Sequence, residues 1–109
     1  MTTVTFLNEE GRIIGFDAVG HSDYGDEGED LVCAAVTSAV RLVECTINDV
    51  MGLCASVKVR EQEAALSLRL PGGLSPTAEA TCQNLMVGMM VYLATLHGEY
   101  PENIEVLEA

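Results

Sequence analysis

Basic residues are scarce in this chain. Its 109 residues include five Lys and Arg against 17 Asp and Glu, which gives a formal net charge of −12 at pH 7. A surface of this charge repels phosphate backbones and anionic lipid headgroups. The composition therefore argues against nucleic acids and membrane surfaces as partners and favours a basic protein or peptide.

The chain also lacks the spacings of metal-binding cysteines. Its four cysteines, at positions 33, 45, 54 and 82, form no C-x-x-C pair and no cluster with histidine. We therefore expect no metal and no cofactor. The N-terminus has no basic flank followed by an apolar run, so we predict no signal peptide, and free thiols favour the cytoplasm.

Long charge-free runs are rare, with one exception at 80–98. This run contains Gln83, Asn84 and His97 and has acidic flanks, which predicts a buried helix rather than a membrane span. With 49% hydrophobic and 20% charged residues, a chain of this length can bury a core. We expect a single domain over residues 1–109.

Five segments have the pattern of strands and two have the pattern of helices. Alternating apolar and polar residues predict strands at 4–7, 12–19, 55–60, 66–70 and 103–108, and three- and four-residue periods predict helices at 31–51 and 76–96. Asp30 would be the N-cap of the first helix, and Gly52 would end it. The predicted fold is α+β, a two-layer sandwich of order β-β-α-β-β-α-β with one mixed sheet and two helices on one face.

One pair of residues indicates chemistry. His21 follows the second predicted strand, and Cys33 would lie in the first turn of the first helix, where the helix dipole stabilises a thiolate. The loop predicted over 20–30 is long enough to bring imidazole and sulfur together. A cysteine in an apolar helix is more often a core residue, so spacing alone leaves both interpretations open.

The residues around this pair resemble a known family signature. Gly20-His21, a glycine-punctuated loop, and the run Gly28-Glu29-Asp30-Leu31-Val32-Cys33-Ala34-Ala35 resemble the ribosomal-processing cysteine proteases called Prp. Lengths and element order resemble that family along almost the whole chain. The resemblance implies a homodimeric enzyme that removes the N-terminal extension of a large-subunit ribosomal protein, of the L-twenty-seven type.

The resemblance also implies roles for single residues. His21 and Cys33 match the catalytic dyad, Gly20 and Asp30 match supporting positions, and either Thr37 or Ser38 matches a hydroxyl position.

The mechanism expected from the predicted elements is acyl transfer to Cys33. The N–H groups of Cys33 and Ala34, at the start of the predicted helix, would bind the oxyanion. The loop from Ser22 to Glu29 would act as a lid, because Gly25 and Gly28 permit large backbone changes. Its acids would form a rim that attracts a basic substrate.

Two other functions fit the same sequence. The first is a non-catalytic acidic module that binds a basic ribosomal protein during ribosome assembly. The second is a thiol hydrolase acting on a small acyl or thioester substrate. Faster alkylation of Cys33 than of Cys45, Cys54 and Cys82 below pH 8 would favour catalysis, since those three cysteines have no partner histidine and are expected to have packing roles.

Overall fold

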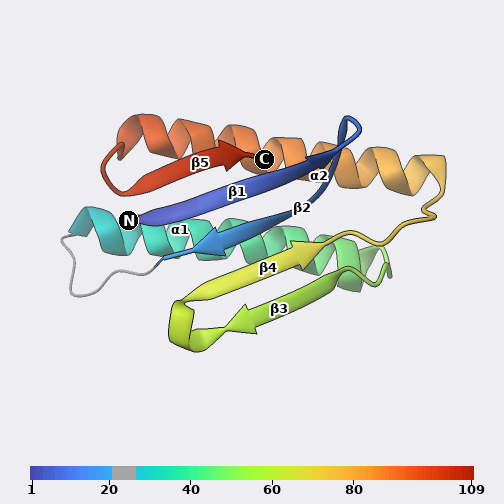
Figure 1. Ribbon diagram of the computed structural model, residues 1–109, viewed down its shortest axis with the longest axis horizontal. Helices are drawn as coiled ribbons and strands as arrows, with labels where there is room; N and C mark the ends of the chain where they lie inside the picture. Colours follow the sequence, from blue (N-terminus) through green and yellow to red (C-terminus); the bar gives the residue numbers. More distant parts are fainter. Residues whose placement is uncertain (21–26) are drawn as a thin grey trace.

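The computed structural model describes residues 1–20 and 27–109, and it confirms the predicted α+β class (Figure 1). In chain order the elements are β1 (Thr2–Glu9), β2 (Arg12–Val19), α1 (Glu27–Glu44), the π-helix η1 (Cys45–Val50), β3 (Ser56–Arg60), the 3-10 helix η2 (Glu61–Glu63), β4 (Ala65–Arg69), α2 (Pro76–Glu99) and β5 (Ile104–Glu108).

The five strands form one mixed sheet with the order β3-β4-β2-β1-β5. Neighbouring strands are antiparallel except β1 and β5, which are parallel. The parallel pair places the last strand beside the first, and the C-terminal Ala109 accepts a hydrogen bond from the N–H of Asn8 near the end of β1. Both helices lie on the same face, as predicted (Figure 1).

The first hairpin turns within two residues. Glu10 and Gly11 both have positive φ, at 52° and 80°, which is the type I′ geometry that matches the twist of paired strands. Strand pairing therefore continues to Glu9 and resumes at Arg12. The predicted strand 12–19 is confirmed, and β1 extends beyond the predicted 4–7 at both ends.

The predicted start of the first helix is wrong. Helix α1 begins at Glu27, so Gly28 and Glu29 belong to its first turn rather than to a lid, and Asp30 lies inside the helix rather than at its N-cap. Acidic residues suit the first turn because they face the positive end of the helix dipole.

The predicted end of this helix is confirmed at Gly52. The helix continues from α1 into η1. After its last turn, the N–H of Leu53 donates to the carbonyl of Ile47 at 3.0 Å, which caps the C-terminal end of the helix. Gly52 has φ of +70°, a conformation that glycine adopts without a steric cost.

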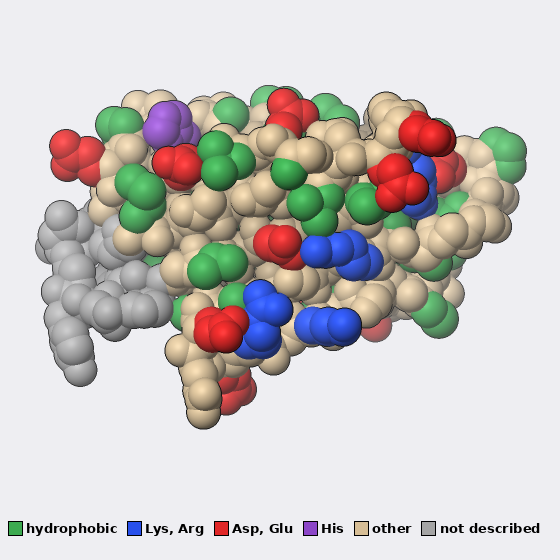
Figure 2. Space-filling model, in the orientation of Figure 1, with side chains coloured by type: hydrophobic (Ala, Val, Ile, Leu, Met, Phe, Trp, Pro, Cys, Tyr) green, Lys and Arg blue, Asp and Glu red, His purple; other side chains and the backbone are tan. Residues whose placement is uncertain are grey.

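The core fills the space between the sheet and the two helices. On the helix-facing side of the sheet, Phe6 and Phe16 are fully buried with ring centroids 5.9 Å apart. Because both helices lie on one face, neither of them covers the opposite face of the sheet (Figure 1). Three of the five basic residues, Lys58, Arg60 and Arg69, lie on β3 and β4 and gather on this face (Figure 2).

One ion pair on the open face joins neighbouring strands. Arg69 contacts Asp17 at 2.9 Å, with both side chains partly exposed. Burial raises the pKa of Asp17, but hydrogen bonds from Ser67 and Arg69 and the nearby positive charges outweigh it, so this pKa lies below its ordinary value. The carboxylate is therefore charged throughout the neutral range.

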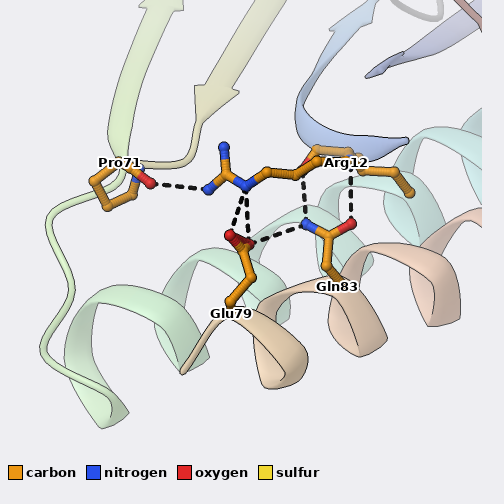
Figure 3. A network of polar contacts seen from close by, with 5 residues as sticks. Arg12, Pro71, Glu79 and Gln83 are labelled. Atoms are coloured by element: carbon orange, nitrogen blue, oxygen red, sulfur yellow. Dashed lines mark hydrogen bonds and ion pairs between the residues drawn. The ribbon is translucent and has the colours of Figure 1, made fainter. Parts of the chain in front are cut away.

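A polar network ties α2 to the start of β2. Figure 3 shows Arg12 between Pro71 and Glu79, and Gln83 reaching from α2 toward β2. The Nε of Arg12 donates to both carboxylate oxygens of Glu79, at 2.9 and 2.7 Å. The side chain of Gln83 exchanges two hydrogen bonds with the backbone of Ile13, both 2.9 Å long. The Gln83 side chain thus satisfies both backbone hydrogen-bonding groups of Ile13, as a neighbouring strand would.

Replacing Gln83 with leucine is expected to lower the free energy of unfolding by about 2 kcal/mol, because the N–H and the carbonyl of buried Ile13 lose their partner. The melting temperature should fall by about 5 °C or more. Gln62→Leu, the same change at an exposed glutamine of η2, is the matched control. Equal melting temperatures for the two variants would contradict this role of Gln83.

The charge-free run 80–98 forms most of α2, and its buried residues pack in the core, as predicted: Cys82, Met86, Met89, Leu93 and Leu96. Within the described residues, the helical stretch Leu31–Val50 is long and apolar enough to cross a membrane by length and composition alone. Core helices of soluble proteins pass the same test, so this observation is weak evidence.

Candidate active site

A cavity of about 330 Å³ opens between α1 and one end of the sheet. One wall is the sheet-facing margin of α1, and the other is formed by the start of β1, the end of β2 and the β3–β4 hairpin. The helix contributes Cys33, Val36, Thr37, Val40 and Arg41. These positions recur at three- and four-residue steps, so one helical face runs along the cavity.

Cys33 lies half-buried at this wall, as the helical period predicts. Its neighbours Val32 and Val36 are buried against the sheet, at 0% and 5% exposure. Cys33 lies at the margin of this apolar stripe, so its side chain lines the cavity while part of it stays buried against the sheet. The Sγ of Cys33 lies 3.8 Å from the Oγ1 of Thr2 at the start of β1.

The two candidate hydroxyl residues lie on different sides of α1. Thr37, one helical turn beyond Cys33, lines the same cavity. Ser38 lines a separate groove between α1 and α2. Of the two, the structure brings only Thr37 together with Cys33.

Gly20 also lines the cavity, and no other residue fits its position. Its φ is +125°, and a Cβ atom would lie 2.3 Å from the carbonyl oxygen of Met1 and 2.9 Å from the Cα of Thr2. Its N–H donates to the carbonyl of Ala64 at 3.1 Å. Gly20 therefore holds the end of β2 against the start of β1, directly before His21.

Several predicted site residues lie outside the described residues. His21, Ser22 and Gly25 belong to the segment 21–26, and the side chains of Glu29 and Asp30 are likewise outside what the structure describes. The pairing of His21 with Cys33 and the closing of a lid stay predictions.

The predicted oxyanion site at Cys33 and Ala34 stays a prediction, but the helix start on which it was argued differs in the structure. Since α1 begins at Glu27, the N–H groups of Cys33 and Ala34 lie beyond the first turn, where helical hydrogen bonds to carbonyls four residues earlier engage them. They are not the unpaired donors that the expected helix start would provide. Ala34 is also exposed and does not line the cavity.

The described rim of the cavity carries both signs of charge. Arg41 and Arg60 line it together with Glu61, so two of the five basic residues of the chain contribute to the cavity that also contains Cys33. The expectation of an acidic rim took no account of them. Arg41 follows Cys33 by eight residues on the same helical face, so its spacing could have predicted that it lines the cavity. Arg60 lies at the end of β3, and only the strand order of the sheet brings it to the cavity.

The other three cysteines lie away from the cavity. Cys82 is fully buried in the core, and burial together with the charge of Glu79 raises the pKa of its thiol. Cys45 and Cys54 are exposed on the surface. No three His, Cys, Asp or Glu side chains within the described ranges 1–20 and 27–109 could hold a metal ion together.

Comparison with known proteins gives one consistent result. The sequence model of a family described as cysteine protease Prp matches residues 1–105. The ribosomal processing cysteine protease Prp of Bacillus subtilis is 31% identical over 104 residues, which cover 95% of this chain and 92% of that protein. The protein of the same name from Staphylococcus aureus is 26% identical over 103 residues, covering 92% and 91%.

Solved structures agree with the sequence comparisons. A structure of Prp from S. aureus in complex with a substrate peptide matches the whole chain with a TM-score of 0.84 at 25% identity. A second structure, with a covalently linked product peptide, matches with a TM-score of 0.81 at 25% identity. A Streptococcus mutans protein shares the fold at 19% identity, with a TM-score of 0.83 over 99% of this chain and 93% of its own.

Proposed function

The chain belongs to the Prp family of ribosomal processing cysteine proteases, and on that premise we propose that it removes the N-terminal extension of a large-subunit ribosomal protein of the L-twenty-seven type. One observation on this chain's own residues supports the proposal. The single described cysteine that lines the cavity, Cys33, stands half-buried at its wall.

The proposed chemistry is acyl transfer through a Cys33–His21 dyad. The thiolate of Cys33 attacks the scissile carbonyl, and the protonated imidazole of His21 gives its proton to the leaving amine. Water then hydrolyses the thioester, releases the acid product and restores the thiol. The S. aureus relative with a covalently linked product peptide supports a nucleophilic route of this kind.

The cavity supports a peptide as the substrate. Besides Cys33, its walls carry the apolar side chains of Val36, Val40, Val59 and Leu66, which can bury an apolar side chain next to the scissile bond. A cavity of about 330 Å³ holds side chains rather than a folded protein. An extended, unfolded segment such as an N-terminal extension meets this requirement.

The outer face of the helical layer supports the proposed homodimer. An apolar groove between α1 and α2 contains Leu42, which is 67% exposed, and Tyr92, which is 48% exposed. Contiguous apolar surface of this kind is typical of subunit interfaces. We infer a homodimer that meets through this groove and acts in the cytoplasm without binding nucleic acid directly. Sedimentation velocity of the purified protein at micromolar concentration tests this, since the proposal expects the mass of a dimer.

The deciding experiment is incubation of the purified protein with the precursor ribosomal protein, followed by mass spectrometry. The proposal expects a shortened product and a released N-terminal peptide. An acidic binding module would bind the precursor and leave its mass unchanged. A small-molecule thiol hydrolase would cleave short acyl thioesters but neither the precursor nor peptides that span its extension.

A further inference from the structure

Thr2 is a buried polar residue beside the candidate nucleophile. It is 3% exposed, and among the described residues it is the one buried polar or charged residue. Residues at Thr2, Val4 and Phe6 are buried in alternation along β1, so the Thr2 side chain lies on the helix-facing side of the sheet. It therefore faces the layer in which α1 lies.

The backbone holds Thr2 rigidly at this place. Its N–H donates to the carbonyl of Asn103 at 2.9 Å, and it pairs with Ile104 in the parallel ladder of β1 and β5. On its other side, Gly20 approaches so closely that a Cβ there would lie 2.9 Å from the Cα of Thr2. Thr2 thus lies between the strand end that leads to His21 and the helix that carries Cys33.

The contact between the two side chains can be a hydrogen bond in either direction. The Oγ1 of Thr2 lies 3.8 Å from the Sγ of Cys33, which is within range for a sulfur partner. A thiol can donate to the hydroxyl, whereas a thiolate can only accept from it. The charge-assisted form is the stronger one, so the hydroxyl favours the thiolate.

We propose that Thr2 is a positioning residue that donates its hydroxyl hydrogen bond to the Cys33 thiolate and holds the sulfur at the cavity wall. The inference rests on the proposed role of Cys33 as nucleophile. Thr2 acts through Cys33 and does not itself touch the reacting carbonyl. The rigid start of β1 supplies the donor in place, without any movement when the thiolate forms.

The experiment measures how fast iodoacetamide alkylates Cys33 as a function of pH. A Cys45→Ser, Cys54→Ser background removes the two exposed competing thiols, and mass spectrometry identifies the alkylated residue. Thr2→Val removes the hydroxyl and keeps the shape of the side chain. Thr2→Ser keeps the hydroxyl and removes the methyl group.

Thr2→Val is expected to slow alkylation of Cys33 at pH 7 by about three- to tenfold, because the thiolate loses its hydrogen-bond donor. Thr2→Ser should stay within about twofold of the parent protein. The melting temperature of Thr2→Val should not fall, because an apolar side chain of the same shape suits a buried site. If Thr2→Val does not fold, Thr2→Ala compared with Thr2→Ser gives the same test.

An alkylation profile of Thr2→Val that superimposes on the parent would overturn the proposal, as would equal slowing in the valine and serine variants. Failure of the proposed function gives a different result. If Cys33→Ala cleaves the precursor at the wild-type rate, Cys33 is not the nucleophile, yet the alkylation profile still decides whether Thr2 stabilises its thiolate.

Discussion

Cys33→Ala is expected to lower the rate of precursor cleavage by about 10³-fold or more, since it removes the group that forms the acyl-enzyme. The cavity offers only weak replacements among the described residues. Thr2 and Thr37 carry hydroxyl groups there, and a hydroxyl is a far poorer nucleophile than a thiolate at neutral pH. Mass spectrometry of the shortened ribosomal protein measures the rate directly.

The matched control is Cys54→Ala, an equivalent change at an exposed cysteine outside the cavity. It should cleave at the wild-type rate. Because Cys33 is only half-buried, its loss should cost about 1 kcal/mol of stability or less, so the inactive variant remains folded. A Cys33→Ala protein that still cleaves normally would exclude the thiol mechanism.

Local periodicity predicted most of the fold. The second helix begins at residue 76, as predicted, and the hydroxyl of its N-cap Ser75 accepts from the N–H of Ala78 at 3.1 Å. The predicted strand 12–19 coincides with β2. These signals depend on neighbours within a few residues, which the sequence displays directly.

The start of α1 could not be predicted from the same signals. Glycines and consecutive acids are typical of loops, and the sequence around Gly28 contains both. Helix formation there depends on the balance between the cost of glycine and the favourable position of acids near the helix N-terminus. Because α1 begins at Glu27, the expected oxyanion donors Cys33 and Ala34 lie beyond its first turn, and their role stays a prediction.

The candidate site divides in the same way. The sequence could predict Cys33 and Thr37 because they lie one turn apart on the same helical face. It could predict Gly20 because this glycine follows a strand and directly precedes a histidine. Thr2 carries no such signal, because a threonine at the start of a strand is ordinary. Only the pairing of β1 between β2 and β5 brings it to the cavity, and sheet order depends on contacts far apart in the sequence.

Gly20 tests whether this arrangement of strand ends supports catalysis. Gly20→Ala is expected to lower the free energy of unfolding by about 2 to 4 kcal/mol, combining a positive-φ cost with a steric overlap. To relieve the overlap, the end of β2 must move away from Met1 and Thr2, and His21 moves with it. Precursor cleavage should therefore fall by more than tenfold even under conditions where the variant is folded.

Gly73→Ala separates the two causes. Gly73 has φ of +69° with no atom within 4 Å of its hypothetical Cβ, so alanine there carries the backbone cost alone, about 1 kcal/mol. Urea unfolding gives the stability of each variant. Cleavage is then compared without denaturant, at a temperature where both variants are folded. Equal stability losses and wild-type cleavage in both variants would mean that the close approach at Gly20 does not position His21. A larger loss of cleavage in Gly20→Ala alone would trace the requirement for glycine to the contact between the two strand ends.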